Sequence, residues 1–135
     1  METKFVNLFV LKTKQERILF ELFKKRNHAI DRFAHNSILI LNQNKIVLSG
    51  EKLQQDDIIK ELFNYVSLNV DVYVIACNEK FDKQIMKLSE AIMAFFDDPL
   101  QMIITDGEKF ALIKEELSGN YSQKYLLINH KQSIK

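Results

Sequence analysis

The chain has 135 residues, one cysteine and a formal net charge of +1, from 19 basic and 18 acidic side chains. So small a net charge excludes a strong field for attracting nucleic acid or an anionic membrane, and a lone cysteine excludes an intrachain disulfide framework. No apolar run approaches the roughly 20 residues that span a membrane. The composition therefore predicts one cytoplasmic domain over residues 1–130, followed by a flexible tail at 131–135.

The first half of the chain begins with an apolar segment at 4–11, which predicts a strand. Residues 13–16 have the pattern of a capping box and predict a helix, which apolar residues at helical spacing extend to Phe33. The short apolar run at 37–41 predicts a buried strand. Residues 45–48 form either a brief strand or part of a loop.

The second half of the chain continues the alternation. The predicted elements are a helix from Asp56, a strand at 70–76, a helix from about 79 to 96, a strand at 101–105, a short helix at 110–117 and a strand at 124–129. Alternating strands and helices predict a mostly parallel sheet with helices on both faces. We therefore expect an α/β fold, a single three-layer α/β/α domain with about five strands, of the flavodoxin-like kind.

Cys77 follows the predicted strand at 70–76, and the carboxyl end of a strand is where α/β proteins present reactive groups. A helix beginning near residue 79 or 80 would lower the pKa of this thiol, and so would Lys80 and Lys83 in the next turn. These features favour a nucleophilic thiolate. The alternative is a small buried hydrophobic residue, since free cysteine is often buried.

Other chemistry has little support in the sequence. Three scattered glycines cannot form a phosphate-binding loop, and His28, His35 and His130 lack the spacing of metal ligands. The basic run at 24–26 reads as the solvated outer face of the first helix. We therefore expect no metal or organic cofactor, no direct binding of nucleic acid and no binding to membranes.

Four stretches resemble the DsrE/DsrH (TusB/TusD) family of sulfur-relay proteins. Residues 36–47 resemble its second strand with the polar turn that follows, and 70–77 resemble its third strand, ending in Cys77. Residues 102–110 resemble a late strand that leads into a short helix, and 124–129 stand where a closing strand would be. The resemblance implies a DsrE-like fold.

The resemblance also implies a function. The chain would be a small cytoplasmic subunit of a sulfur-relay assembly, passing sulfane sulfur between protein cysteines as a persulfide on Cys77, in tRNA thiolation or sulfur oxidation. Lys80 would stabilise the thiolate, and Asn78 and Asp106 would line the mouth of the site. Its partners would be related small subunits and sulfur donor and acceptor proteins.

Two other functions remain open. The chain could be a non-catalytic, oligomeric interaction subunit of the same fold with a buried structural Cys77. It could also be a small-ligand or regulatory domain that uses the crevice at the strand ends.

Overall fold

The sheet at the centre of the fold is antiparallel. The computed structural model describes residues 1–117 and 122–129, and within them six strands pair in the order β1-β6-β5-β4-β2-β3. Each neighbouring pair runs antiparallel. The strands are β1 (Ile46–Gly50), β2 (Asp71–Ala76), β3 (Ile85–Lys87), β4 (Met102–Thr105), β5 (Phe110–Lys114) and β6 (Lys124–Ile128). The fold is thus α+β, and the expected mostly parallel, flavodoxin-like or DsrE-like sheet is wrong.

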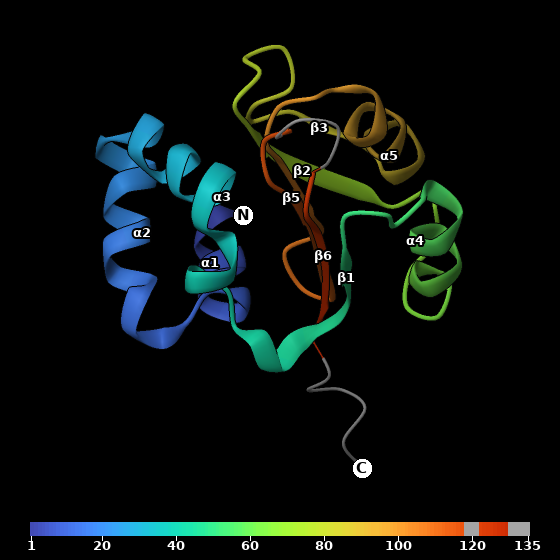
Figure 1. Ribbon diagram of the computed structural model, residues 1–135, viewed down its shortest axis with the longest axis horizontal. Coiled ribbons are helices and arrows are strands. Elements are labelled where there is room, and N and C mark those ends of the chain that lie inside the picture. Colours follow the sequence, from blue (N-terminus) through green and yellow to red (C-terminus); the bar gives the residue numbers. More distant parts are fainter. Residues whose placement is uncertain (118–121, 130–135) are drawn as a thin grey trace.

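Helices cover both faces of this sheet, as Figure 1 shows. Three N-terminal helices pack on one face, and two later helices pack on the other. They are α1 (Glu2–Phe9), α2 (Lys12–Lys24) and α3 (Arg26–Ile40) on the first face, and α4 (Gln55–Leu62) and α5 (Leu88–Asp97) on the second. A 3₁₀ turn at Gln43–Lys45 leads from α3 into β1.

The inner strands are buried on both faces, which explains why the sequence predicts parallel strands. Ile103 and Ile113 face α1–α3, whereas the adjacent Ile104 and Leu112 face α4 and α5. Successive side chains of a strand point to opposite faces, so a strand covered on both sides reads as a continuous apolar run. Such runs are typical of parallel sheets, because those sheets are usually covered on both sides. Here an antiparallel sheet has the same covering.

The N-terminal segment at 4–11, expected as a strand, lies mostly in α1. Phe5, Val6 and Phe9 point into the core from one side of that helix. The spacing i, i+1, i+4 matches a helical face as well as a buried strand does. The segment is too short for its periodicity to separate the two structures.

The expected single helix from residue 13 to Phe33 is two helices, and the run at 37–41 belongs mainly to the second. Lys25 separates α2 from α3 with non-helical angles of φ −140° and ψ 59°. Ser37 at the end of α3 donates its hydroxyl hydrogen to the Phe33 carbonyl, one turn back. Residues 37–41 are therefore not a strand, whereas 45–48, left open by the sequence, lie almost wholly in β1.

Two predicted helices of the second half are also corrected. The helix expected from residue 79 begins only at Leu88, after a turn and the short strand β3. The helix expected at 110–117 is strand β5, paired with β4 in a hairpin. The strands at 70–76, 101–105 and 124–129 and the helix from Asp56 are confirmed within one or two residues. The tail expected at 131–135 lies outside the described residues.

The β4–β5 hairpin turns at Asp106 and Gly107. The Asp106 carboxylate accepts backbone N–H groups from Glu108, Lys109 and Phe110, at 3.0, 2.8 and 3.2 Å. Gly107 has a φ of 79°, a conformation that glycine adopts without steric cost. This turn chemistry fits a hairpin and leaves no helix start after Gly107.

Candidate functional site

Cys77 stands directly after β2, and its side chain is exposed. Its N–H donates to the Gln101 carbonyl at 3.3 Å, which extends the β2–β4 pairing by one residue. The structure thus places this thiol at the surface and not in the buried position that the interaction-subunit alternative expected.

The surroundings of Cys77 do not favour a thiolate. Partial burial raises the pKa of Cys77, and the carboxylates of Glu116 and Asp98 raise it further. The amino end of α5 cannot offset this effect, because Leu88 bonds to the Val70 carbonyl at the opposite end of β2. At neutral pH the thiol is therefore mainly protonated.

The predicted supporting residues have other contacts. Lys80 donates its backbone N–H to the Asn78 side-chain oxygen at 3.0 Å, and its ammonium lies 5.5 Å from the centre of the Phe81 ring. The Asn78 amide donates to the Asp98 carboxylate at 2.8 Å. These two residues build the turn after β2 and tie it to the end of α5.

Asp106 does not share a site with Cys77. Ala76 pairs with Met102 and Tyr73 pairs with Thr105, so Asp106 lies at the other end of β4 from Cys77. In an antiparallel pair the carboxyl ends of the two strands lie at opposite edges of the sheet. The predicted mouth, which required parallel strands, is therefore not formed.

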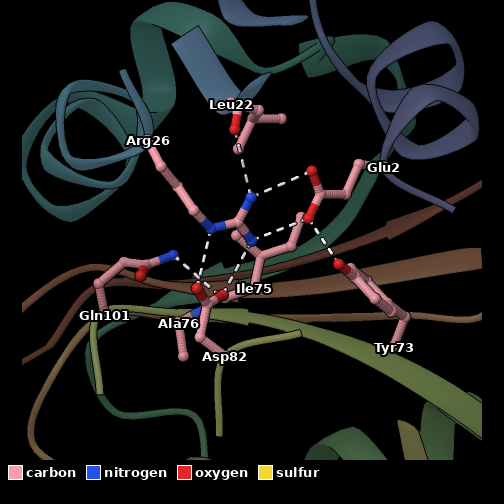
Figure 2. Close-up of polar contacts among 8 residues, drawn as sticks. All are labelled: Glu2, Leu22, Arg26, Tyr73, Ile75, Ala76, Asp82 and Gln101. Carbon is pink, nitrogen blue, oxygen red and sulfur yellow. Dashed lines mark hydrogen bonds and ion pairs between the residues drawn. The ribbon is translucent and has the colours of Figure 1, made fainter. Parts of the chain in front are cut away.

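The structure instead gathers charged groups around Arg26, the first residue of α3 (Figure 2). Its guanidinium forms a bidentate pair with Asp82, at 2.8 and 2.9 Å, and an ion pair with Glu2 at 2.8 Å. It also donates to the Leu22 carbonyl at 3.5 Å. These side chains are largely buried, with exposed fractions of 16% for Arg26 and Asp82 and 21% for Glu2.

The Arg26 cluster reaches the sheet through two further hydrogen bonds. The Tyr73 hydroxyl donates to Glu2 at 2.6 Å, and the Ala76 N–H donates to Asp82 at 2.9 Å. Burial and the Glu2 carboxylate raise the pKa of Tyr73, so its phenol stays protonated and cannot serve as a base near neutral pH. Arg26 thus contacts α1, α2 and the loop after β2, and its partners Glu2 and Asp82 extend the connection to β2.

An open hollow of about 720 Å³ borders the Arg26 cluster. Its lining combines the polar groups of Glu2, Arg26, Tyr73 and Lys83 with apolar side chains that include Leu19 and Phe23. Glu2, Arg26 and Tyr73 already bind one another, so they hold the fold together more than they offer contacts to a ligand.

The outer face of α2 carries a second feature, which sequence reasoning missed. Phe23 is 80% exposed and Phe20 is 54% exposed, and the Lys24 ammonium lies 4.8 Å from the centre of the Phe23 ring. Most of the exposed charged side chains in the same segment are basic: Lys12, Lys14, Arg17, Lys24 and Lys25. Within the described range 12–25, Glu16 is the one exposed acid. We call these residues the α2 face.

The spacing of the phenylalanines could have revealed the α2 face. The buried stripe of α2 contains Ile18 and Leu22, four residues apart. Phe20 and Phe23 are three residues apart and fall outside that stripe, on another side of the helix. Of the basic run at 24–26, predicted to be a solvated face, Lys24 and Lys25 are exposed, whereas Arg26 is largely buried in its ion pairs with Asp82 and Glu2.

The comparisons with known proteins identify no family: the chain matches no family model, no curated protein and no solved structure. In the part of the chain that the structure describes, no helix is long and apolar enough to cross a membrane. Across residues 1–117 and 122–129, histidine, cysteine and acidic side chains form no group of three or more that could hold a metal ion.

Proposed function

We propose that this chain is a protein-binding domain that uses the α2 face to bind an acidic, amphipathic segment of a partner protein. The observation that carries the proposal is the exposure of Phe20 and Phe23, three residues apart on a helix whose exposed charged side chains are basic except for Glu16. Single exposed apolar residues are common on protein surfaces. Two adjacent aromatic rings ringed by charge are typical of a binding surface.

The energetic argument rests on the two rings. Covering an exposed phenylalanine side chain contributes about 1.5–3 kcal/mol. Large aromatic anchors of this kind carry much of the binding energy at protein interfaces. Phe23 also borders the hollow beside the Arg26 cluster, so the α2 face adjoins a depression into which a partner side chain can fit.

The charge of the α2 face selects the chemistry of the partner. Lys12, Lys14, Arg17 and Lys24 are exposed on the same helix as the two rings, and Lys24 lies 4.8 Å from the centre of the Phe23 ring. Complementary charge on a partner increases the rate of association. An amphipathic helix with apolar anchors three and four residues apart and acidic flanks offers both components. A lipid bilayer would offer anionic charge but no side chains that fit the hollow beside Phe23.

The test is fluorescence anisotropy with a labelled synthetic helix that carries leucine and tryptophan at i, i+3, i+4 and i+7 and glutamate elsewhere. The double variant Phe20→Ala/Phe23→Ala should weaken binding at least tenfold, and raised salt should weaken binding by the wild type. The control is Met93→Ala, a variant of another exposed apolar residue, which lies on α5 at the opposite face of the sheet.

Equal binding by the wild type and the double variant would refute the proposal. So would equal affinity for a sequence-scrambled peptide of the same composition. Binding to vesicles of anionic lipid without binding to the peptide would assign the α2 face to a membrane surface instead.

A second proposal is sulfur transfer through Cys77, which the exposure of its thiol supports. The deprotonated thiol would attack the terminal sulfur of a donor persulfide, form a new S–S bond and release the donor as a thiolate. The raised pKa of Cys77 makes this reaction slow near neutral pH.

Intact mass after incubation with a persulfide donor tests sulfur transfer, with Cys77→Ser as control. A reductant-sensitive gain of one sulfur in the wild type alone supports it. No gain at pH 9, where more of the thiol is ionised, would exclude it.

A further inference from the structure

A separate hollow of about 240 Å³ lies between α2 and α3. Its polar lining is basic, with Lys14 and Arg17 from α2 and Arg32 from α3, and Asn36 adds a neutral amide. Apolar side chains form the rest of the wall: Ile18, Leu39 and Ile40. A basic hollow with an apolar wall suits an anion that carries a hydrophobic group.

A buried carboxylate holds the two arginines in place. Glu21 accepts a bidentate pair from Arg32, at 2.7 and 2.9 Å, and a single hydrogen bond from Arg17 at 3.3 Å. The Glu21 side chain is only 5% exposed, whereas Arg17 is 68% exposed and Arg32 is 36% exposed. The hydrogen bond from Arg32 and the one from Arg17 keep the pKa of Glu21 below its ordinary value, so Glu21 stays charged.

Several donors remain after these contacts are counted. Glu21 takes the Nε and Nη2 groups of Arg32 and only Nε of Arg17. Both Nη groups of Arg17 and Nη1 of Arg32 stay available, and Lys14 has no side-chain partner within the described residues. Asp31 also acts on the charge of Arg32, and its carboxylate lies 3.5 Å from His35. Positive charge is thus in excess at the hollow.

The backbone of α3 changes direction at the same place. Asn36 has non-helical angles of φ −137° and ψ 30°, and the next N–H, that of Ser37, donates to the Glu115 carboxylate at 3.1 Å. The turn of the chain places the Asn36 and Leu39 side chains in the wall of the hollow. A break in the helix therefore shapes the wall opposite Lys14 and Arg17.

We propose that this hollow binds a phosphate monoester whose organic group rests on Ile18 and Leu39. Guanidinium groups bind phosphate oxygens through paired N–H donors, and a lysine adds a point charge. Glu21 orients the arginines before the ligand arrives, which reduces the cost of binding. A dianionic phosphate matches the excess of positive charge better than a carboxylate does. The hollow shares Lys14 and Arg17 with the α2 face, but its lining does not include Phe20 or Phe23. Variants of the two phenylalanines therefore test peptide binding without removing a residue of this site.

The test is a titration of the ¹⁵N-labelled protein with phenyl phosphate in a buffer of low ionic strength. Backbone amides of 14–18 and 32–40 should shift and saturate. The double variant Lys14→Ala/Arg17→Met should weaken binding at least tenfold, because it removes donors and leaves the Arg32–Glu21 pair intact. Lys60→Ala, which removes an exposed charge from α4, should bind within twofold of the wild type.

Three outcomes would overturn the proposal. Shifts spread over the whole surface would show unspecific ion binding, and an unchanged Kd in the double variant would place the ligand elsewhere. Benzoate binding as tightly as phenyl phosphate would replace the phosphate monoester with a carboxylate. Phe20→Ala/Phe23→Ala should retain phenyl phosphate binding, which separates this site from the peptide-binding surface.

Discussion

Arg26 and Asp82 form a bidentate ion pair although 56 positions separate them in the sequence. The pair joins the first turn of α3 to the loop between β2 and β3, and Glu2 completes it from α1. It connects the helical layer to an edge of the sheet through charged groups that are mostly shielded from water. Breaking a buried pair by removing one partner leaves an uncompensated charge in the interior.

Replacing Arg26 should therefore be strongly destabilising. Arg26→Met keeps much of the aliphatic stem but leaves Glu2 and Asp82 facing each other without a cation. We expect a loss of about 3–5 kcal/mol in the free energy of unfolding, measured by urea denaturation. The control Lys60→Ala replaces an exposed residue on α4 and should change the free energy of unfolding by less than about 0.5 kcal/mol. A loss below 1 kcal/mol for Arg26→Met would show that water reaches the cluster.

Tyr73→Phe tests the outer hydrogen bond of the same cluster. The variant removes only the hydroxyl that donates to Glu2, and a hydrogen bond to a charged group contributes about 1.5–3 kcal/mol. The loss should fall in that range and below the loss for Arg26→Met. Because the two residues share Glu2, the double variant should lose less than the sum of the single losses. If the two single losses add up to the loss in the double variant, Arg26 and Tyr73 are not coupled through Glu2.

Gly107→Ala should weaken the β4–β5 hairpin. Gly107 has a φ of 79°, and an added Cβ would collide with the sulfur of Met1. The left-handed backbone costs a residue with a Cβ about 1–2 kcal/mol, and the flexible Met1 side chain can move aside at small further cost. We expect the free energy of unfolding, measured by urea denaturation, to fall by about 1–3 kcal/mol. Gly107→Asn should recover part of it, because asparagine tolerates this conformation; equal losses would argue against backbone strain.

Lys114 should make stability depend on pH in the alkaline range. Burial is the main cause that lowers the pKa of Lys114 to about 8, and its amine bonds to the Phe95 and Asp98 carbonyls. Between pH 8 and about 10.5 the unfolded chain then binds more protons at this site than the folded protein does. The contribution of Lys114 to stability therefore rises as pH increases through that range.

The comparison with Lys114→Met isolates this contribution from the tyrosines and Cys77. The difference in unfolding free energy, wild type minus variant, should grow between pH 8 and pH 10.5, on the order of 3 kcal/mol in total. A difference that stays constant would mean that Lys114 is charged in the folded state over the whole range.

Cys77 should react with iodoacetamide in the native protein, because its side chain is exposed. Its raised pKa makes the thiolate scarcer than in the unfolded chain, so the native rate at pH 8 should be several-fold slower than the rate in urea. Asp98→Asn should increase the native rate by removing one of the carboxylates that raise the pKa. Mass spectrometry of the alkylated protein measures these rates. A native rate above the denatured rate would show that the fold lowers the pKa of Cys77.

The strands at 70–76, 101–105 and 124–129 could be predicted from the sequence because short apolar runs between turn residues favour extended structure. The direction of these strands could not be predicted from the sequence. Residues 110–117 show why. Phe110, Ile113 and Leu117 have helical spacing, but 110–114 are apolar at nearly every position and pair with β4. The pairing of β5 with β4, which sets Leu112 opposite Ile104, decides in favour of the strand. Periodicity within one segment does not report such a long-range pairing.

The predicted site failed for a related reason. Cys77, Asn78, Lys80 and Asp106 were placed together on the assumption that neighbouring strands end at one edge. The antiparallel pairing of β2 with β4 moves Asp106 to the other end of the sheet. Cys77 was correctly located at a strand end, but its pKa depends on groups such as Glu116 and Asp98, which only the fold brings near.

The sequence by itself determined the local features of this protein: the apolar segments of β2, β4 and β6, the helix that begins near Asp56 and the position of Cys77 after a strand. These follow from side-chain size, spacing and turn chemistry within a few residues. The tertiary structure alone decided the strand order, the Arg26 cluster and the hollow around Arg17 and Arg32. Each of those joins residues far apart in the chain, and their contact energies depend on burial that one segment cannot create alone.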